Sequence, residues 1–400
     1  MKDTEGLLFL LLLLSSIELK YVSCRDSSYI TIPLGTSGGL DDSDLSSFLL
    51  TKKGSNLFIT FDAGTIWTGV SKFLANKNYV RSFNIVFPQW ATQEDQQIAW
   101  FVKNYILAYV IGHPHLDHVA GLVEASPEDY LPSGVLNIHP PIETGLLALL
   151  KHIIDPILLD SKQILSKKTI VGLPNTIQAI KDNLFNNLIW PNLPDFGRYD
   201  YYTMKEGHSY DLMELVFLNN SDRENLGKNF PNNVEIKPFP TCHNDMMSTA
   251  FLLTDKITGD QIVFFSDTGI PSENVIGITC DYLKRIRIIW QSIHINKLKA
   301  IFLECSYTNS QPSTQLFGHL RPKDVIPVLA ELIDYGIQTT PKTMNLRHVK
   351  LVVQHIKPMA NQSPTTNFSV RQLIYKELSE SNKFLGIQII IPEQGEPICL

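Results

Sequence analysis

Three histidines and an aspartate fall within six consecutive positions, directly after an apolar run: His113, His115, Asp117 and His118. Imidazole and carboxylate groups are suitable ligands for zinc and similar divalent ions. Tight turns would keep all four from reaching one tetrahedral ion, so two neighbouring ions, each taking two of the four, is the easier geometry. Two such ions can clamp the attacking and leaving oxygens of a phosphoryl displacement. The cluster therefore predicts a two-metal site, with a solvated polar loop as the alternative.

Further candidate ligands stand where apolar, strand-like segments end. His243 closes VEIKPFPTCH, Asp267 closes QIVFFSD, Glu304 closes AIFLE and His355 closes KLVVQH. Strand ends meet at one rim of an open sheet, which is where a shared site can form. Taken singly, a lone histidine is more often a surface or satisfied residue, and an aspartate before Thr-Gly is typical of a turn. The cluster at 113–118 favours the metal hypothesis for all of them.

The chain of 400 residues is long enough for one large domain or two, and no linker or internal repeat divides it. Strand-like segments lie at 29–40, 56–65, 104–112, 234–243, 249–269, 299–306, 349–358 and 384–392. Between the two groups, about 125–230 contains helical segments such as 174–190 and is predicted to be a helical insertion or lid. A further helix is predicted at 321–336. A single α/β domain over 25–400 fits best.

The charge pattern bears on the class of substrate. The formal net charge is −6 and no block rich in Lys and Arg is present. A long nucleic-acid polymer is therefore not favoured as a partner, because it would need cations to neutralise a run of phosphates.

The first 24 residues are interpreted as a secretory signal peptide with cleavage near Cys24. The apolar run 6–14 is too short to span a bilayer as a helix, and small residues follow it. The predicted location is secreted, without a stable membrane span after signal removal; an uncleaved membrane anchor is the alternative. Glycosylation sequons at Asn219 and Asn367 agree with export. The remaining cysteines are spread out, and the sequence allows one bridge without indicating its pairing.

The pattern H-x-H-x-D-H after a strand, followed by isolated ligands at later strand ends, resembles the metallo-β-lactamase superfamily. That resemblance implies a four-layer αββα sandwich with a dinuclear metal site at one edge. Further segments, in order from residue 30 to about 390, resemble the class II cyclic-nucleotide phosphodiesterases. They are LGTSGGLDDSDLSSFLL (34–50), FDAGT (61–65), HPHLDHVAGL (113–122), TIVGLPNTIQAIKDNLFNNLIWPNL (169–193), FPTCH (239–243), FSDTG (265–269), ECSY (304–307), LFGHLRP (316–322) and QHIKP (354–358).

The resemblance implies a role for each candidate ligand. One divalent metal ion, zinc by preference, would be held by His113, His115 and His243. The other would be held by Asp117, His118 and His355, with Asp267 bridging the two; Asp117 is also counted among the catalytic groups. Asp62 and Gly64, in FDAGT, are expected to support the site, with an ordinary turn as the alternative for Asp62.

The expected reaction is hydrolysis of a cyclic nucleotide, cAMP or cGMP or both, to the nucleoside 5′-monophosphate by an activated hydroxide. His319, oriented by Glu304, is predicted to protonate the leaving 3′ oxygen. Substrate positioning, or a helix-start histidine without chemistry, is the alternative role for His319. Asn186, Trp190 and Asn192 are candidates for contact with the substrate, and the aromatic residues of that region are otherwise expected to pack within the lid.

Two other functions stay open at this point. An RNA-processing nuclease or another ester hydrolase could use the same scaffold, although the acidity and the absence of a basic arm argue against RNA. A secreted binding protein that has lost its chemistry is the non-enzymatic alternative, but all seven expected ligand positions are filled. The preference between cAMP and cGMP is not predicted.

Overall fold

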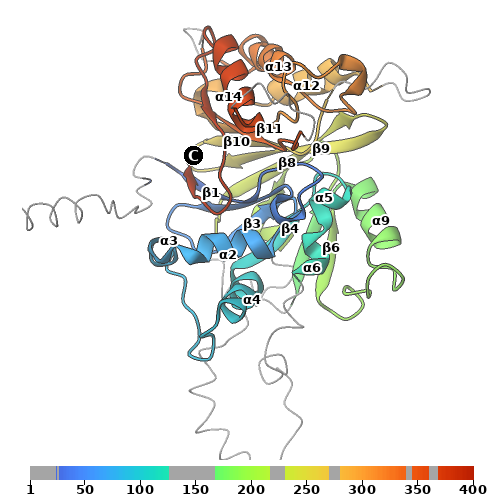
Figure 1. Ribbon diagram of the computed structural model, residues 1–400, viewed down its shortest axis with the longest axis vertical. Helices are drawn as coiled ribbons and strands as arrows, with labels where there is room; N and C mark the ends of the chain where they lie inside the picture. Colours follow the sequence, from blue (N-terminus) through green and yellow to red (C-terminus); the bar gives the residue numbers. More distant parts are fainter. Residues whose placement is uncertain are drawn as a thin grey trace, which may run out of the picture.

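Two seven-stranded sheets form the centre of the molecule (Figure 1). The computed structural model describes residues 24, 27–125, 167–216, 230–269, 280–338, 345–359 and 368–400. The strand order is β14-β1-β2-β3-β4-β5-β6 in the first sheet and β13-β12-β11-β10-β9-β8-β7 in the second.

The first sheet is antiparallel from β14 to β3 and parallel from β3 to β6. Its strands are β1 (Tyr29–Gly35), β2 (Ser47–Lys52), β3 (Phe58–Phe61), β4 (Ile106–Val110), β5 (Lys168–Gly172), β6 (Tyr199–Thr203) and β14 (Ile398–Cys399). Strand β4 is buried along its whole length and leads directly into the 113–118 cluster. Burial on both faces explains its continuous apolar sequence.

The second sheet is antiparallel from β7 to β10 and parallel from β10 to β13. Its strands are β7 (Tyr210–Asp211), β8 (Val234–His243), β9 (Met246–Asp255), β10 (Gln261–Phe265), β11 (Leu298–Glu304), β12 (Lys350–Gln354) and β13 (Gln388–Ile390). The carboxyl ends of β10, β11 and β12 point the same way, so the residues that follow them meet at one edge.

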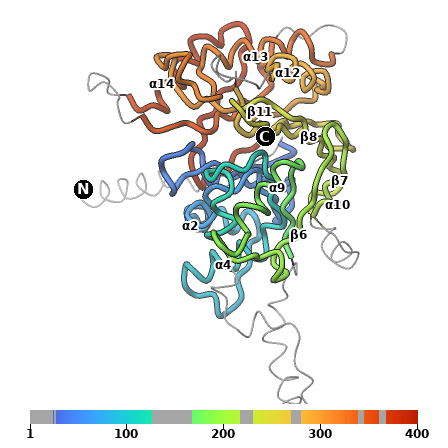
Figure 2. Tube along the Cα trace, turned by 90° about the vertical axis from the view of Figure 1, so that its right-hand side faces the viewer, coloured from blue at the N-terminus to red at the C-terminus, as the bar shows by residue number. Residues whose placement is uncertain are grey.

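Helices cover the outer face of each sheet, which gives four layers (Figures 1 and 2). The helices on the first sheet's side are α2 (Trp67–Ala75), α3 (Lys77–Ser82), α4 (Glu94–Tyr105), α5 (Leu116–Val119), α6 (Gly121–Glu124), α9 (Pro174–Asn183) and α10 (Leu212–Val216). Helices α12 (Tyr282–Trp290), α13 (Pro322–Tyr335) and α14 (Val370–Ser381) cover the second sheet.

Aromatic side chains lock the inner faces of the sheets together. Phe61 of the first sheet stacks on Phe264 of the second with ring centroids 4.6 Å apart, and Phe48 meets Phe302 edge-on at 5.5 Å. Such pairs add to the stabilisation that comes from burial alone. A second core lies between the second sheet and α12–α14. The metal-ligand candidates therefore stand on a rigid frame.

Helix α13 shows how the local sequence sets an element. Pro322 occupies its first turn, where a fixed φ suits a helix and a missing N–H costs nothing, and Gly336 follows its last residue. Val325, Leu329 and Leu332 form its buried stripe against the second sheet. The predicted helix at 321–336 is therefore confirmed.

Three sequence boundaries differ from the structure. The predicted strand at 104–112 begins only at Ile106, because Asn104 and Tyr105 belong to the end of α4, which passes into β4 without a loop. The predicted helix at 174–190 ends at Asn183, and the strand expected at 384–392 is limited to Gln388–Ile390.

The range 125–230, predicted to be a helical insertion, is not helical throughout. Its described part holds α9 and α10, but it also supplies β5 and β6 to the first sheet and β7 to the second. Residues 126–166 and 217–229 lie outside the described residues, as do the sequon asparagines Asn219 and Asn367.

Two disulfides join distant segments. Cys24 pairs with Cys399 over a sequence separation of 375, and Cys242 pairs with Cys280. Cys305 is a buried free thiol. The sequence had suggested one bridge of unknown pairing, and the first bridge ties Cys24, assigned to the end of the leader, to the folded domain. None of the helices in the described ranges has the length and apolarity needed to span a bilayer.

Candidate metal centre and active site

The metal-ligand candidates of both sheets meet at one edge of the sandwich. The first sheet contributes the loop after β4, and the second contributes the ends of β8, β10, β11 and β12. The seven expected ligands lie together in three overlapping groups, each with its ligand atoms within 4.8 Å of one another: His113, His115 and His243; Asp117, His118 and His355; and His113, His118 and Asp267.

The first two groups are the two ligand sets that the resemblance implies. In the first, the ring centroids of His113 and His243 are 5.0 Å apart, and those of His115 and His243 are 5.2 Å apart. In the second, His355 Nε2 lies 3.2 Å from Asp117 Oδ2. His115 faces solvent, so the site opens on that side.

Asp267 lies between the two groups. Its Oδ2 is 3.8 Å from Nε2 of both His113 and His243, and 3.1 Å from Nε2 of His355. Its Oδ1 is 3.3 Å from Nε2 of His118. A carboxylate in this position can reach an ion in either group.

Several of these atoms are buried and have no hydrogen-bond partner among the described residues. They are Nε2 of His113, Nε2 of His118 and Oδ1 of Asp267. An orphaned polar atom in the interior is costly unless another partner satisfies it. Imidazole nitrogens and a carboxylate oxygen that point at one another fit divalent metal ions, zinc among them.

Asp62 orients His118 directly and reaches His113 through the Ser266 hydroxyl. Its Oδ2 accepts from His118 Nδ1 at 2.8 Å and from the Ser266 hydroxyl at 2.7 Å, while Oδ1 accepts the Gly112 backbone N–H. Partners of this kind fix which ring nitrogen faces the metal. Asp62 has φ 55°, an uncommon conformation for a residue other than glycine. Backbone strain of this kind gathers at functional sites.

Gly64 allows two segments to approach closely beside the site. A Cβ atom there would lie 2.2 Å from the Asp117 carbonyl oxygen and 2.7 Å from the Leu45 Cβ. Any larger residue would therefore push the 113–118 loop away from the first sheet, which fits the supporting position predicted for it.

Glu304 and His319 form a buried pair beside the ligands. Nδ1 of His319 lies 3.0 Å from both carboxylate oxygens of Glu304. Glu304 also accepts the Thr268 N–H at 2.7 Å. His319 Nδ1 is 3.8 Å from Asp267 Oδ2, so the pair touches the metal-ligand groups.

The direction of the histidine pKa shifts differs between the two ligand groups. Burial, with the neighbouring His118, holds the pKa of His113 well below its usual value, and burial lowers the pKa of His243 to about 4. Burial alone would also lower the pKa of His118, but Asp267, Asp62 and Asp117 outweigh it and raise that pKa well above its usual value. The pKa shifts thus favour neutral rings at His113 and His243 and the protonated ring at His118.

The three candidates for substrate contact lie in the loop after α9. Asn186 Oδ1 accepts the backbone N–H groups of Leu188 and Ile189, and Asn192 Nδ2 donates to Asp195. Trp190 packs against the first core. Asn186 Nδ2 also donates to the Asp182 carbonyl in α9, so these side-chain hydrogen bonds lie within the loop or tie it to the end of that helix. The N-terminus of α9 approaches the site through Thr176, whose hydroxyl is 3.4 Å from the Gly112 carbonyl, whereas this loop follows its other end.

Sequence reasoning missed the serines behind the histidines. Ser266 stands next to Asp267, and Ser306 stands two residues after Glu304. Both hydroxyls are buried and bond a histidine ring and a carboxylate. Their position beside strand-end ligands was the available signal, but serine is too common for that signal to stand alone.

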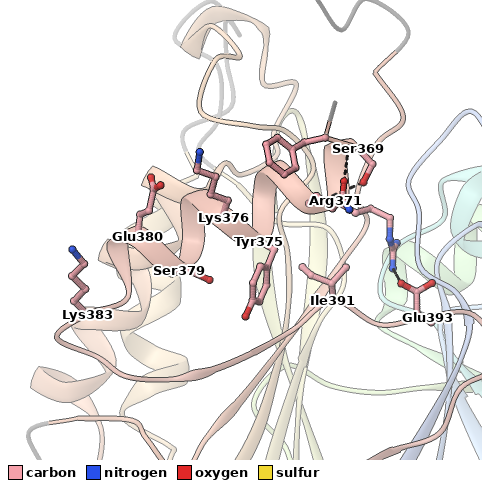
Figure 3. Close-up of a pocket in the computed structure, with 11 residues that line it drawn as sticks. Ser369, Arg371, Tyr375, Lys376, Ser379, Glu380, Lys383, Ile391 and Glu393 are labelled. Carbon is pink, nitrogen blue, oxygen red and sulfur yellow. Dashed lines mark hydrogen bonds and ion pairs between the residues drawn. The ribbon is translucent and has the colours of Figure 1, made fainter. Parts of the chain in front are cut away.

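A groove of about 1000 Å³ lies elsewhere, along α14 (Figure 3). Tyr375 and Ile391 face each other in it, and Arg371 is paired with Glu393. It shares no residue with the metal-ligand groups. The groove is therefore separate from the candidate metal centre.

Comparisons with known proteins agree with this geometry. The family model of class-II cAMP phosphodiesterases matches residues 23–395. A cAMP/cGMP-dependent 3′,5′-cAMP/cGMP phosphodiesterase A of Dictyostelium discoideum is 50% identical over 378 residues, covering 94% of this chain and 82% of that protein. A 3′,5′-cyclic-nucleotide phosphodiesterase of Aliivibrio fischeri is 27% identical and covers 94% of each.

Among solved structures, unliganded yeast PDE1 matches with a TM-score of 0.67 at 19% identity, covering 94% of this chain and 100% of that chain. The predicted metallo-β-lactamase-like αββα fold is confirmed, and the family match decides against the RNA-processing and non-enzymatic hypotheses. The chain belongs to the class-II cAMP phosphodiesterase family and is a 3′,5′-cyclic-nucleotide phosphodiesterase.

Proposed function

We propose that this protein hydrolyses 3′,5′-cAMP and 3′,5′-cGMP to the nucleoside 5′-monophosphates at a site that holds two divalent ions, zinc by preference. The observation that carries the proposal is the meeting of two three-residue ligand groups around Asp267. The inclusion of both nucleotides follows the names of the Dictyostelium relatives.

One ion would be held by His113, His115 and His243. The other would be held by Asp117, His118 and His355, and Asp267 would bind both ions. When bound, the ions offset the charge of the phosphodiester and lower the pKa of a water molecule that supplies the nucleophile. The imidazoles and carboxylates keep the two positions a fixed distance apart, because each stands on a strand end or on the 113–118 loop.

His319 supplies the proton for the leaving group. Because its Nδ1–H donates to Glu304, its Nε2 is the nitrogen that can present a proton. The P–O3′ bond breaks as the new bond to the nucleophile forms, and the proton passes from Nε2 to the 3′ oxygen. The Glu304 carboxylate stabilises the imidazolium that donates it. Asn186, Trp190 and Asn192 stay candidates for contact with the nucleoside.

The test is turnover of both cyclic nucleotides by purified protein, with metal content measured by mass spectrometry. We expect 5′-AMP and 5′-GMP as products, two ions per chain, loss of turnover with a chelator and recovery with Zn²⁺. Metal-free protein that turns over neither nucleotide after Zn²⁺ is added would refute the proposal. A 3′-monophosphate product would refute the assigned leaving group alone.

We also propose that the chain is secreted after removal of its leader. The two disulfides support this, because such bridges persist in oxidising compartments. Cleavage on the N-terminal side of Cys24 would retain the bridge to Cys399. N-terminal sequencing and intact mass of protein from the culture medium test this, together with glycan removal at Asn219 and Asn367. Protein that stays with the membrane fraction and keeps residues 1–23 would favour the anchored alternative.

A further inference from the structure

One carboxylate serves both the metal-ligand groups and the acid–base pair. Glu304 Oε2 accepts the Ser306 hydroxyl at 2.6 Å, and the same carboxylate accepts His319 Nδ1 at 3.0 Å. Ser306 Oγ also lies 3.0 Å from Nδ1 of the ligand His355. Ser306, Glu304 and His355 are all fully buried, so water does not compete for these bonds.

The proton inventory of this chain permits only one arrangement. A serine hydroxyl has a single proton, and an ionised carboxylate can only accept. Since Ser306 donates to Glu304, its lone pair must accept a proton from Nδ1 of His355. In the neutral ring, the lone pair is then on Nε2, which lies 3.2 Å from Asp117 Oδ2 and 3.1 Å from Asp267 Oδ2 and so faces the ligand group. The serine thus selects the tautomer that can ligate a metal ion.

The His355 ring is packed closely between its neighbours: it stacks on the rings of His118 and His319, with centroids 5.2 Å and 5.0 Å away. His355 has φ 58°, and a Cβ atom on Gly38 would lie 2.2 Å from its Cε1. The ring is therefore pressed against a glycine on one side, and its orientation depends on the hydrogen bond at Nδ1.

The other ligand group has a matching arrangement. Nδ1 of His113 lies 3.0 Å from Ser266 Oγ, and Ser266 donates to Asp62 at 2.7 Å. The same inventory makes Ser266 an acceptor for His113. Each ligand group therefore has one histidine oriented by a carboxylate through a serine.

We propose that Ser306 is a positioning residue that links the Glu304–His319 pair to the second ion through His355, and that Ser266 has the equivalent role for the first ion through His113. The inference rests on the ligand roles in the proposed function. It assigns the two serines to different ions, which a general contribution to stability would not do.

The experiment titrates Zn²⁺, and then Co²⁺ for its visible absorption, into the metal-free full chain of each variant. For Ser306→Ala we expect about 10–100-fold weaker binding of the ion held by His355, with the other ion unchanged. Ser266→Ala is expected to weaken the other ion instead. In a His355→Ala background, Ser306→Ala should add no further loss. Ser306→Thr, which keeps the hydroxyl, should restore affinity.

The matched control is Ser248→Ala, since Ser248 is also fully buried but its hydroxyl has no partner in the described residues. Thermal unfolding of each metal-free variant measures stability separately. If Ser306→Ala does not fold, Ser306→Gly replaces it, because it also removes the hydroxyl and introduces no metal-binding group.

Kinetics give a second readout. We expect Ser306→Ala to lower kcat more than it changes KM at saturating Zn²⁺, because His319 shares the disturbed carboxylate. Wild-type affinity for both ions in Ser306→Ala, or equal weakening of the same ion by both serine variants, would overturn the inference. Failure of the wild-type protein to turn over cyclic nucleotides would refute the proposed function instead, since the titrations do not depend on activity.

Discussion

The two sheets contribute to the metal centre in opposite ways. The first supplies four ligands from one segment of six residues, 113–118, which joins the loop after β4 to the start of α5. The second supplies its groups from the separate ends of β8, β10, β11 and β12. We call segment 113–118 the compact half of the site and the strand-end ligands of the second sheet the distributed half. The compact half can keep its shape through local turns, whereas the distributed half depends on the register of a whole sheet. Asp267 and Asp62 join them, because each bonds or faces residues of both halves.

The largest effect is expected where the two halves meet. Asp267→Ala removes the carboxylate that both ions would share, so we expect both metal affinities to fall and kcat/KM to drop about 10⁴-fold or more. Metal analysis and steady-state kinetics check this. Asp200→Asn, on an exposed ion pair with Lys167, should change neither. An Asp267→Ala protein with two tightly held ions would show that the halves are not coupled through this residue.

A smaller loss of activity is expected from a substitution on the second sheet's side of the site that removes no metal ligand. His319→Ala should lower kcat on the order of 10²–10³-fold while both ions stay bound, because it removes the proton donor and no ligand. His208→Ala is the matched control, because His208 is exposed and its ring bonds the nearby Glu206 carbonyl. Unchanged kcat at saturating substrate would remove His319 from the mechanism.

The pH dependence of metal binding should separate the two ligand groups. The pKa of His118 is raised, so its ring must lose a proton before it ligates, and affinity at that group should rise about tenfold per pH unit until pH passes that pKa. The pKa of His243 is lowered to about 4 and that of His113 is lowered too, so the imidazoles of the other group are already neutral above pH 6.5 and its metal affinity should not change with pH there.

Calorimetry in two buffers of different ionisation enthalpy counts the protons that are released when each ion binds. Equal proton release at both groups would contradict this difference.

The smallest effect is expected outside both halves, in the loop after α9. Asn186→Ala removes an acceptor for two backbone N–H groups, so we expect a loss of about 1 kcal/mol in the free energy of unfolding. KM should stay within about twofold. A tenfold rise in KM with unchanged stability would instead establish Asn186 as a substrate contact. Denaturant unfolding and kinetics decide between these outcomes.

The compact half was predictable from the sequence because its ligands are adjacent and their spacing is improbable by chance. His243, Asp267 and His355 could be proposed only as strand-end residues and through the family resemblance, since their proximity depends on sheet order. Ser266 and Ser306 gave no such signal, because a common residue becomes informative only when its hydrogen bonds are known.

The remaining differences between the predicted and the observed elements concern short strands and a helix that continues directly into a strand. Strand β5 is a run of five residues and β6 is rich in Tyr with one Asp, so neither stands out beside the helical pattern of α9. Helix α4 passes directly into β4, so the apolar run gave no boundary at Ile106. Cysteine pairing over 375 residues has no local signature.

The bridge between Cys24 and Cys399 makes the folded chain a covalent ring. A single proteolytic cut anywhere between these residues opens the ring but leaves the two fragments covalently joined through the disulfide. Nicked protein should therefore migrate as one species until a reductant is added. In a protease-rich medium, the enzyme would stay one molecule after its first cut.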